Sequence, residues 1–286
     1  PDAACHSTVN GCLLTDMQRK AAMKAAGFRW DDTADAPAKT PAVIPADGGS
    51  LDVGERGVSI ATLKKIKRFV EVACELNGGY LASTYDKISS CSNDPYQVCV
   101  KDASCDGGTC DHRVRYTPDK VDMNILTQEL VKHMTRDMWQ ATSAGKGLDD
   151  YDATTVDSRG WSDATGGVAP TGSLAEYEGC DKPTYFISHN WGGSFFNFVE
   201  SINTFYANNM DTFGNAPPEG AFVWVCTFAN NQHNVKKDMG RPGEHETSAF
   251  AKALDNAKAK GGGLLSVQDD SFPQTFTLFR AWCVFE

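Results

Sequence analysis

Three side chains that can do chemistry follow one short apolar run of the chain. The run PTYFISH, residues 183–189, ends in Ser188 and His189, and Trp191 follows after one asparagine. A run of this length and composition predicts a buried strand. At the end of such a strand, His189 can hydrogen-bond a phosphate or a ribose, and Trp191 can stack on a ring. The alternative is that His189 only satisfies backbone groups there, and both interpretations stay open at this point.

A second group of reactive side chains is a cluster of cysteines. Four of the ten cysteines fall within twenty residues: Cys91, Cys99, Cys105 and Cys110. Their spacing lacks the paired CxxC rhythm that is typical of zinc knuckles, and the segment is polar and turn-forming. We therefore expect two local disulfides, which implies an oxidising compartment. Reduced thiols in an ordinary loop are the alternative.

Other candidate motifs are weaker. A metal site that combines Cys226 or Cys283 with His189 or His233 is disfavoured, because both cysteines are predicted to be small, buried hydrophobic residues. We therefore expect no metal. The glycines of residues 261–263 precede a predicted strand, whereas a phosphate-binding loop leads into a helix. The sequence also lacks the GxSxG, Walker, HExxH and strand-following GxGxxG motifs. Hydrolase, NTPase, zinc-protease and dehydrogenase functions therefore lack their signatures.

Composition limits the partners. The 286 residues include 27 Lys and Arg against 37 Asp and Glu, a net charge of −10. This balance repels phosphate backbones, so we expect no nucleic-acid partner. No stretch approaches the ~18 uninterrupted apolar residues of a membrane-spanning helix. We expect a soluble chain without a membrane span of its own, although it can still dock on a membrane complex.

The first half of the chain is predicted to be helical. Thr15 and Gln18 have capping-box spacing and open a helix in residues 13–28. Residues 58–76 form a second helix, and a third begins at Thr117-Pro118 and runs to about residue 140. The predicted apolar faces of the three are Met17, Ala21 and Ala25; Leu63, Ile66, Phe69, Val70, Ala73 and Leu76; and Ile125, Leu126, Leu130, Met134 and Met138.

From about residue 182 the pattern changes to strands that alternate with helices. Strands are predicted at residues 183–189, 221–229 and 262–268, with helices at residues 194–209 and 247–260 between them. This alternation predicts an α/β sheet with parallel strands. We expect an α+β protein overall.

Three regions follow from this pattern. Residues 1–141 are expected to form a helical N-terminal region that is stapled by the disulfides of its Cys-rich loop at residues 91–110. Residues 142–181 are rich in Gly, Ser, Thr and Asp and are interpreted as a linker. Residues 182–286 form the α/β domain.

Five segments of that last region carry a family resemblance. FISHNWGG, VWVCTFANNQH, SAFAKAL, GGLLSVQDD and LFRAWCVFE resemble, in order and spacing, the divergent Toll/interleukin-receptor-like (TIR-like) domains of protist and algal multidomain proteins. The resemblance covers about residues 182–286 and implies a flavodoxin-like domain with a parallel sheet. Relatives often carry an Asp where Cys226 stands.

The resemblance implies two kinds of function. Some TIR domains cleave the bond between nicotinamide and ribose in NAD with the glutamate of a WCxxE segment, which corresponds to Trp282, Cys283 and Glu286. A carboxylate there can stabilise the oxocarbenium character that develops at the ribose. Other members only assemble with partners through the loop after the second strand. In this chain that loop would include Gly240, Arg241, Pro242 and Gly243.

The sheet expected here is short for the family. A full TIR fold has five parallel strands, whereas three are predicted, and Glu286 is the last residue. The α/β domain therefore looks incomplete, and either a longer chain, the N-terminal region or another subunit must cover the exposed sheet edge. The leading expectation is a non-catalytic accessory subunit that docks into a larger assembly with other protein subunits.

Two alternatives and the compartment stay open. The first alternative is a TIR-type NAD glycohydrolase centred on Glu286, and the second is a nucleotide-binding sensor without chemistry, with Ser188, His189, Trp191 and Trp282 at the ligand. No cofactor is certain, and NAD is the candidate substrate or ligand. The cysteine cluster favours secretion or an organelle lumen such as the thylakoid over the cytosol.

Overall fold

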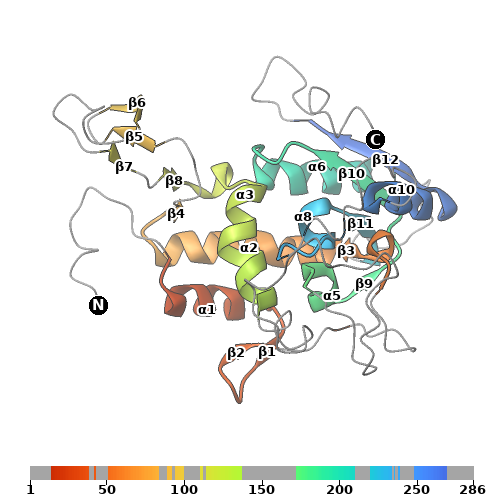
Figure 1. Cartoon of the computed structure of the whole chain (residues 1–286), viewed down its shortest axis with the longest axis horizontal. Helices are drawn as coiled ribbons and strands as arrows, with labels where there is room; N and C mark the ends of the chain where they lie inside the picture. Colours follow the sequence, from red (N-terminus) through yellow and green to blue (C-terminus); the bar gives the residue numbers. More distant parts are fainter. Residues whose placement is uncertain are drawn as a thin grey trace, which may run out of the picture.

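The computed structural model describes a little over half of the chain. The described residues are 14–38, 42, 51–83, 89–91, 94–99, 110–111, 114–136, 172–209, 220–233, 235, 238 and 248–268; among them, residues 82–115 are described by their backbone alone. The described part is α+β, with a mixed parallel and antiparallel sheet between layers of helices (Figure 1).

The central sheet has five strands in the order β12-β10-β11-β3-β9. Its three parallel strands are β10 (Tyr185–His189), β11 (Phe222–Trp224) and β12 (Gly263–Val267). Phe186 of β10 pairs with Trp224 on one side and with Leu264 on the other. The parallel pairing predicted for these three segments is therefore confirmed.

The N-terminal region supplies part of the same sheet. Strand β3 (Gly57–Ser59) runs antiparallel to β11, and β9 (Cys180–Asp181) runs antiparallel to β3. Val58 of β3 is fully buried beside Val223. One side of the parallel strands is thus covered from within the chain.

Helices cover both faces of the sheet. Successive side chains of a strand point to opposite faces. Tyr185 and Ile187 of β10 therefore join the core under α6 (Phe195–Asn208), whereas Phe186 stacks on Trp224 at 5.0 Å between ring centroids and packs against α10 (Ala249–Ala259). Both helices begin at a serine N-cap, and both confirm their predictions.

Three N-terminal helical segments complete the larger core. They are α1 (Asp16–Ala25), α2 (Ile60–Leu76), and α3 (Met123–Leu126) with the π-helix η5 (Thr127–Val131) that continues it. The short elements are β1 (Trp30–Asp31), β2 (Ala36–Pro37), η2 (Val53–Glu55), β4 (Leu81–Ser83), β5 (Ser89–Cys91), β6 (Asp94–Cys99), β7 (Cys110–Asp111), β8 (Val114–Tyr116), η4 (Pro118–Lys120), α5 (Leu174–Glu178) and α8 (Cys226–Ala229).

The predicted apolar face of α1 is wrong. Met17 is 79% exposed, and the buried side chains are Arg19, Ala22 and Met23. The capping box between Thr15 and Gln18 is present as predicted. The buried face of α1 differs from the predicted one because Arg19 points inward, where it forms an ion pair with Glu129 of η5 at 2.9 Å between Nη2 and Oε2. The sequence pattern did not reveal this, since α1 has alanines on more than one face.

Two predicted boundaries also differ. The apolar run of residues 221–229 is strand only to Trp224, and α8 follows, because a short apolar run fits a buried helical turn as well as a strand. The third helix begins at Met123 rather than at Thr117-Pro118, which forms η4. The carboxylate of Asp122 caps it by accepting from the N–H of Ile125 at 2.9 Å.

Most residues of the cysteine cluster lie on short strands whose side chains are outside the described set. Cys91 lies on β5, Cys99 on β6 and Cys110 on β7, and Cys105 is outside the described residues altogether. The predicted disulfides therefore stay a prediction. The cysteines whose side chains are described, Cys74, Cys180 and Cys226, are not in disulfide bonds.

A buried charge cluster joins the start of β3 to the C-terminal half. Arg56 contacts Asp238 at 3.0 Å and Glu176 of α5 at 3.5 Å, and all three side chains are at most 10% exposed. Ser173 donates to Glu176 at 2.7 Å, and the N–H of Asn231 donates to Asp238 at 2.7 Å. Each charge in the cluster therefore has a partner.

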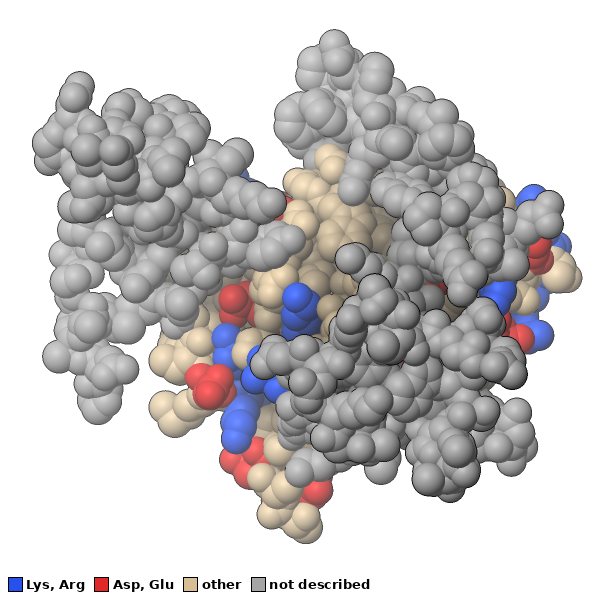
Figure 2. All heavy atoms as spheres, in the orientation of Figure 1, with Lys and Arg blue, Asp and Glu red and all other residues tan. Residues whose placement is uncertain are grey.

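The surface carries mixed charge. On the face drawn in Figure 2, basic and acidic side chains of the described residues lie interspersed. Exposed ion pairs such as Lys24 with Asp32 and Arg68 with Glu71 follow the same pattern. None of the helices in the described ranges combines the length and the apolar character that a membrane crossing requires.

Candidate functional site

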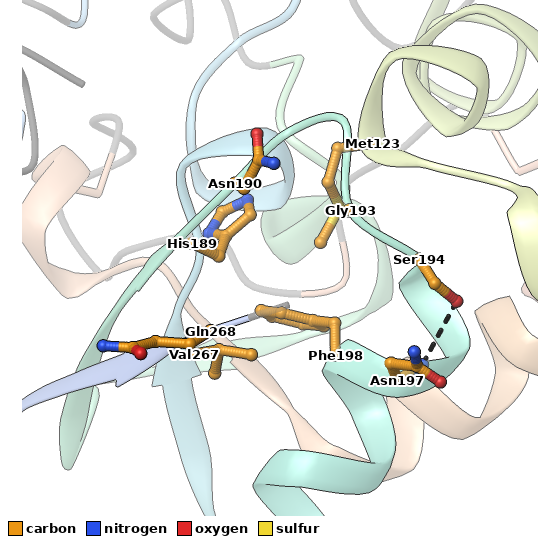
Figure 3. A pocket seen from close by; sticks show the side chains of 9 residues that line it. All are labelled: Met123, His189, Asn190, Gly193, Ser194, Asn197, Phe198, Val267 and Gln268. Carbon is orange, nitrogen blue, oxygen red and sulfur yellow. Dashed lines mark hydrogen bonds between the residues drawn. The ribbon is translucent and has the colours of Figure 1, made fainter. Parts of the chain in front are cut away.

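A small hollow, partly open to solvent, lies at the carboxyl ends of β10 and β12, where α6 begins (Figure 3). The residues that line it are Met123, His189, Asn190, Gly193, Ser194, Asn197, Phe198, Val267 and Gln268.

The strand order explains why the hollow forms at this place. The chain leaves β10 through α6 to reach β11 on one side, and then returns through α10 to β12 on the other side of β10. The connections that leave β10 and enter β12 therefore diverge. In open α/β sheets a crevice forms outside the carboxyl ends of the strands at such a switch point, and ligands bind there.

The loop that forms one wall is held by its own hydrogen bonds. The side-chain oxygen of Asn190 accepts from the N–H of Gly192 at 3.1 Å, and its carbonyl accepts from the N–H of Gly193 at 3.1 Å. Ser194 then caps α6, because its Oγ accepts from the N–H of Asn197 at 3.3 Å (Figure 3). Asn190 and Asn197 both line the hollow.

The N-terminal region supplies one wall of the hollow, through Met123. The N–H of Met123 donates to the carbonyl of Trp191 at 3.0 Å, and the N–H of Phe195 donates to the carbonyl of Val121 at 2.8 Å. The side-chain amide of Asn124 also donates to the carbonyl of Trp191, at 3.4 Å. These bonds fix the segment of residues 121–124 against the loop after β10.

His189 lies at the inner end of the hollow. Its side chain is buried, and its ring lies 5.0 Å from that of Phe198. Nδ1 lies 3.3 Å from the carbonyl oxygen of Ile187. Because a carbonyl can only accept, Nδ1 carries the proton in this contact, and Nε2 of the neutral ring is then an acceptor.

The other strand-end residues singled out by sequence face elsewhere. Ser188 is buried on the α10 side of β10, as the alternation along the strand requires. Trp191 is partly buried, and its indole N–H donates to Sγ of Cys226 at 3.1 Å. Neither residue lines the hollow. Outside the described residues lie the predicted site residues Trp282 and Glu286 and the predicted loop residues Gly240, Arg241, Pro242 and Gly243.

Sequence reasoning missed most of the lining residues. A signal was present, because Gly192-Gly193-Ser194 follows a strand and leads into a helix, which is the arrangement required of a ligand-binding loop. Met123 and Gln268 had no such signal, since their position depends on packing between distant segments.

Among the described residues, the other titratable groups do not form a second site of this kind. Burial raises the pKa of Cys74 to about 11 and that of Cys180 to about 12, so both thiols stay protonated and are poor nucleophiles and metal ligands. Within the described ranges, no group of three or more His, Cys, Asp or Glu side chains is placed to hold a metal ion.

A partly buried histidine contact joins the C-terminal half to the helix that follows η5. Oγ1 of Thr135 donates to the carbonyl of Val131 at 2.7 Å and lies 2.9 Å from Nε2 of His233. The single hydroxyl proton is used for Val131, so Nε2 of His233 donates to Thr135. Burial, followed by the charges of Lys132 and Arg136, lowers the pKa of His233 from 6.5 to about 4.

This contact predicts acid sensitivity. Between pH 6.5 and 4 the unfolded chain binds a proton at His233 that the folded chain does not, so the free energy of unfolding falls as the pH is lowered through this window. Below about pH 4 His233 contributes no further loss. We expect His233→Gln, which keeps a donor for Thr135, to reduce the loss by roughly 2 kcal/mol.

Urea denaturation at pH 7, 5.5 and 4.5 measures this effect. Burial, followed by the charges of Arg19 and Arg136, also lowers the pKa of His133 to about 4. The variant should therefore keep a smaller acid sensitivity from His133. Parallel curves for wild type and His233→Gln over the whole range would contradict the interpretation.

Comparisons of the chain with protein-family models, with curated proteins and with solved structures find no match. The interpretation of the site therefore depends on its geometry and chemistry.

Proposed function

We propose that the protein binds a small ligand with a nucleoside part in the hollow at the carboxyl ends of β10 and β12. The observation that carries this proposal is the position of a partly open hollow at the switch point of the parallel strands, with His189 among its lining residues. Ligands of open α/β sheets bind at this position.

The chemistry of the walls supports a ligand of this class. Met123, Phe198 and Val267 offer an apolar surface for a flat ring. The side-chain amides of Asn190 and Asn197 each provide both donors and acceptors for ring-edge and ribose hydroxyl groups. A mostly apolar lining with a few converging polar groups is typical of small-molecule sites.

The TIR-like identity and the role of NAD remain part of this proposal. If the resemblance is right, NAD is one ligand that contains a nucleoside and can reach this edge. Cleavage of NAD stays a prediction from the sequence, because Trp282 and Glu286 lie outside the described residues. Docking through Gly240, Arg241, Pro242 and Gly243 stays a prediction for the same reason.

Titration calorimetry of the full chain tests the proposal with NAD and with adenosine. We expect saturable binding of at least one of them, weakened about tenfold by Asn197→Ala, since a hydrogen bond to a ligand contributes roughly 1 kcal/mol or somewhat more. Asn208→Ala is the matched control, because this exposed asparagine lies eleven residues further along α6, about 16 Å away.

The same samples separate binding from catalysis. Chromatography of the NAD titration for free nicotinamide would reveal a glycohydrolase, and Glu286→Ala would then have to abolish the release. Absence of binding for both ligands, or equal affinities in Asn197→Ala and wild type, would contradict the proposed site.

A further inference from the structure

We infer that the hollow recognises the uncharged part of its ligand, a nucleoside, and does not bind phosphate at the start of α6. This inference rests on the proposed function and narrows it. Two features carry it: the amides that usually bind phosphate are already bonded within the protein, and the described lining holds no cation.

The backbone amides around the start of α6 are largely occupied. A helix N-terminus binds phosphate through N–H groups that have no partner in the helix. Here the N–H of Phe195 donates to Val121, and that of Asn197 donates to the cap Ser194. The N–H groups of Gly192 and Gly193 both donate to Asn190. A phosphate would have to displace these bonds before it gained its own.

The side chains around the hollow do not compensate a negative charge. The described lining contains no Lys or Arg. Transfer of a phosphate from water into such a site is unfavourable, because nothing replaces the interactions that its charge makes with water.

The same walls fit an uncharged nucleoside. Side-chain amides such as those of Asn190, Asn197 and Gln268 can pair with the edge of an adenine ring through one donor and one acceptor. Phe198 and Met123 provide the apolar surface beside that edge.

Titration of the full chain with adenosine, AMP and ADP tests the inference. We expect adenosine to bind at least tenfold more tightly than AMP, and ADP to bind no more tightly than AMP. The affinity for adenosine should also change little between low and high salt, because no charge pair forms.

A variant that adds the missing cation sharpens the test. Gln268→Lys places an ammonium group at the mouth of the hollow and is expected to raise the ratio of AMP to adenosine affinity at least tenfold, because the phosphate gains a countercharge whereas adenosine loses the Gln268 amide. Ser266→Lys is the control, because this exposed residue of β12 lies outside the hollow. It should change neither affinity by more than a factor of two.

The outcomes separate the inference from the proposed function. AMP or ADP binding as tightly as adenosine in the wild type would overturn the inference and leave the proposed function standing. Failure of adenosine, AMP, ADP and NAD to bind at millimolar concentration would overturn both.

Discussion

Replacement of Arg56 by alanine is expected to lower the free energy of unfolding by about 3–5 kcal/mol. The guanidinium group lies between Asp238 and Glu176, which are both buried. Its removal leaves two carboxylates close together without a countercharge, and burial already raises the pKa of Glu176. The effect arises from uncompensated charge, because the intact cluster itself contributes little net stability.

Chemical denaturation measures this loss against a matched arginine. Arg68 makes an exposed ion pair with Glu71 at 3.3 Å, and Arg68→Ala is expected to change the free energy of unfolding by less than about 1 kcal/mol. If the two alanine variants were equally stable, the cluster around Arg56 would not join β3 to the C-terminal half as described.

The variant Gly262→Ala is expected to be destabilised by about 3 kcal/mol or more. A β-carbon at residue 262 would lie 1.8 Å from the carbonyl oxygen of Thr184, which is backbone and cannot rotate away. Thr184 directly precedes β10, and its N–H donates to Phe222 at 2.8 Å. Relief of the clash would therefore displace β12 from β10 or disturb the contact with β11.

The neighbouring glycine provides the control. A β-carbon at Gly263 would meet no atom within 4 Å. Gly263→Ala is therefore expected to be neutral or slightly stabilising, since alanine restricts the unfolded chain. Thermal unfolding of the two variants should give a much lower midpoint for Gly262→Ala. Equal midpoints would mean that β10 and β12 do not approach each other as closely as the structure shows.

Local rules were sufficient for the elements that position the site. Apolar runs bounded by turn residues placed β10 and β12. Helices predicted at residues 194–209 and 247–260 match α6 and α10, which the structure caps with Ser194 and Ser248. Parallel pairing followed from the alternation of strands and helices. These features depend on neighbouring residues along the chain.

Long-range packing decided the features that were missed. Val58 and Ser59 read as the start of a helix, but they pair with β11, which follows them by more than 160 residues. The burial of the Arg19 side of α1 depends on Glu129, which forms an ion pair with Arg19. No local pattern in the sequence encodes such contacts.

The residues of the site likewise divide into those predicted from local sequence patterns and those placed by long-range packing. His189 was predicted because the end of a strand can be read from sequence. Met123 reaches the hollow only because the segment around Val121 bonds to the loop after β10, and Gln268 reaches it only because β12 pairs with β10.

Hydrogen exchange of the full chain, with and without saturating adenosine, tests whether a nucleoside binds in the hollow at the carboxyl ends of β10 and β12. We expect adenosine to slow exchange in residues 189–198, 121–126 and 267–268, which meet at the hollow. Asn197→Ala should weaken this protection. Protection confined to α1, α2 or α10, or the same protection pattern in Asn197→Ala at equal adenosine concentration, would contradict it.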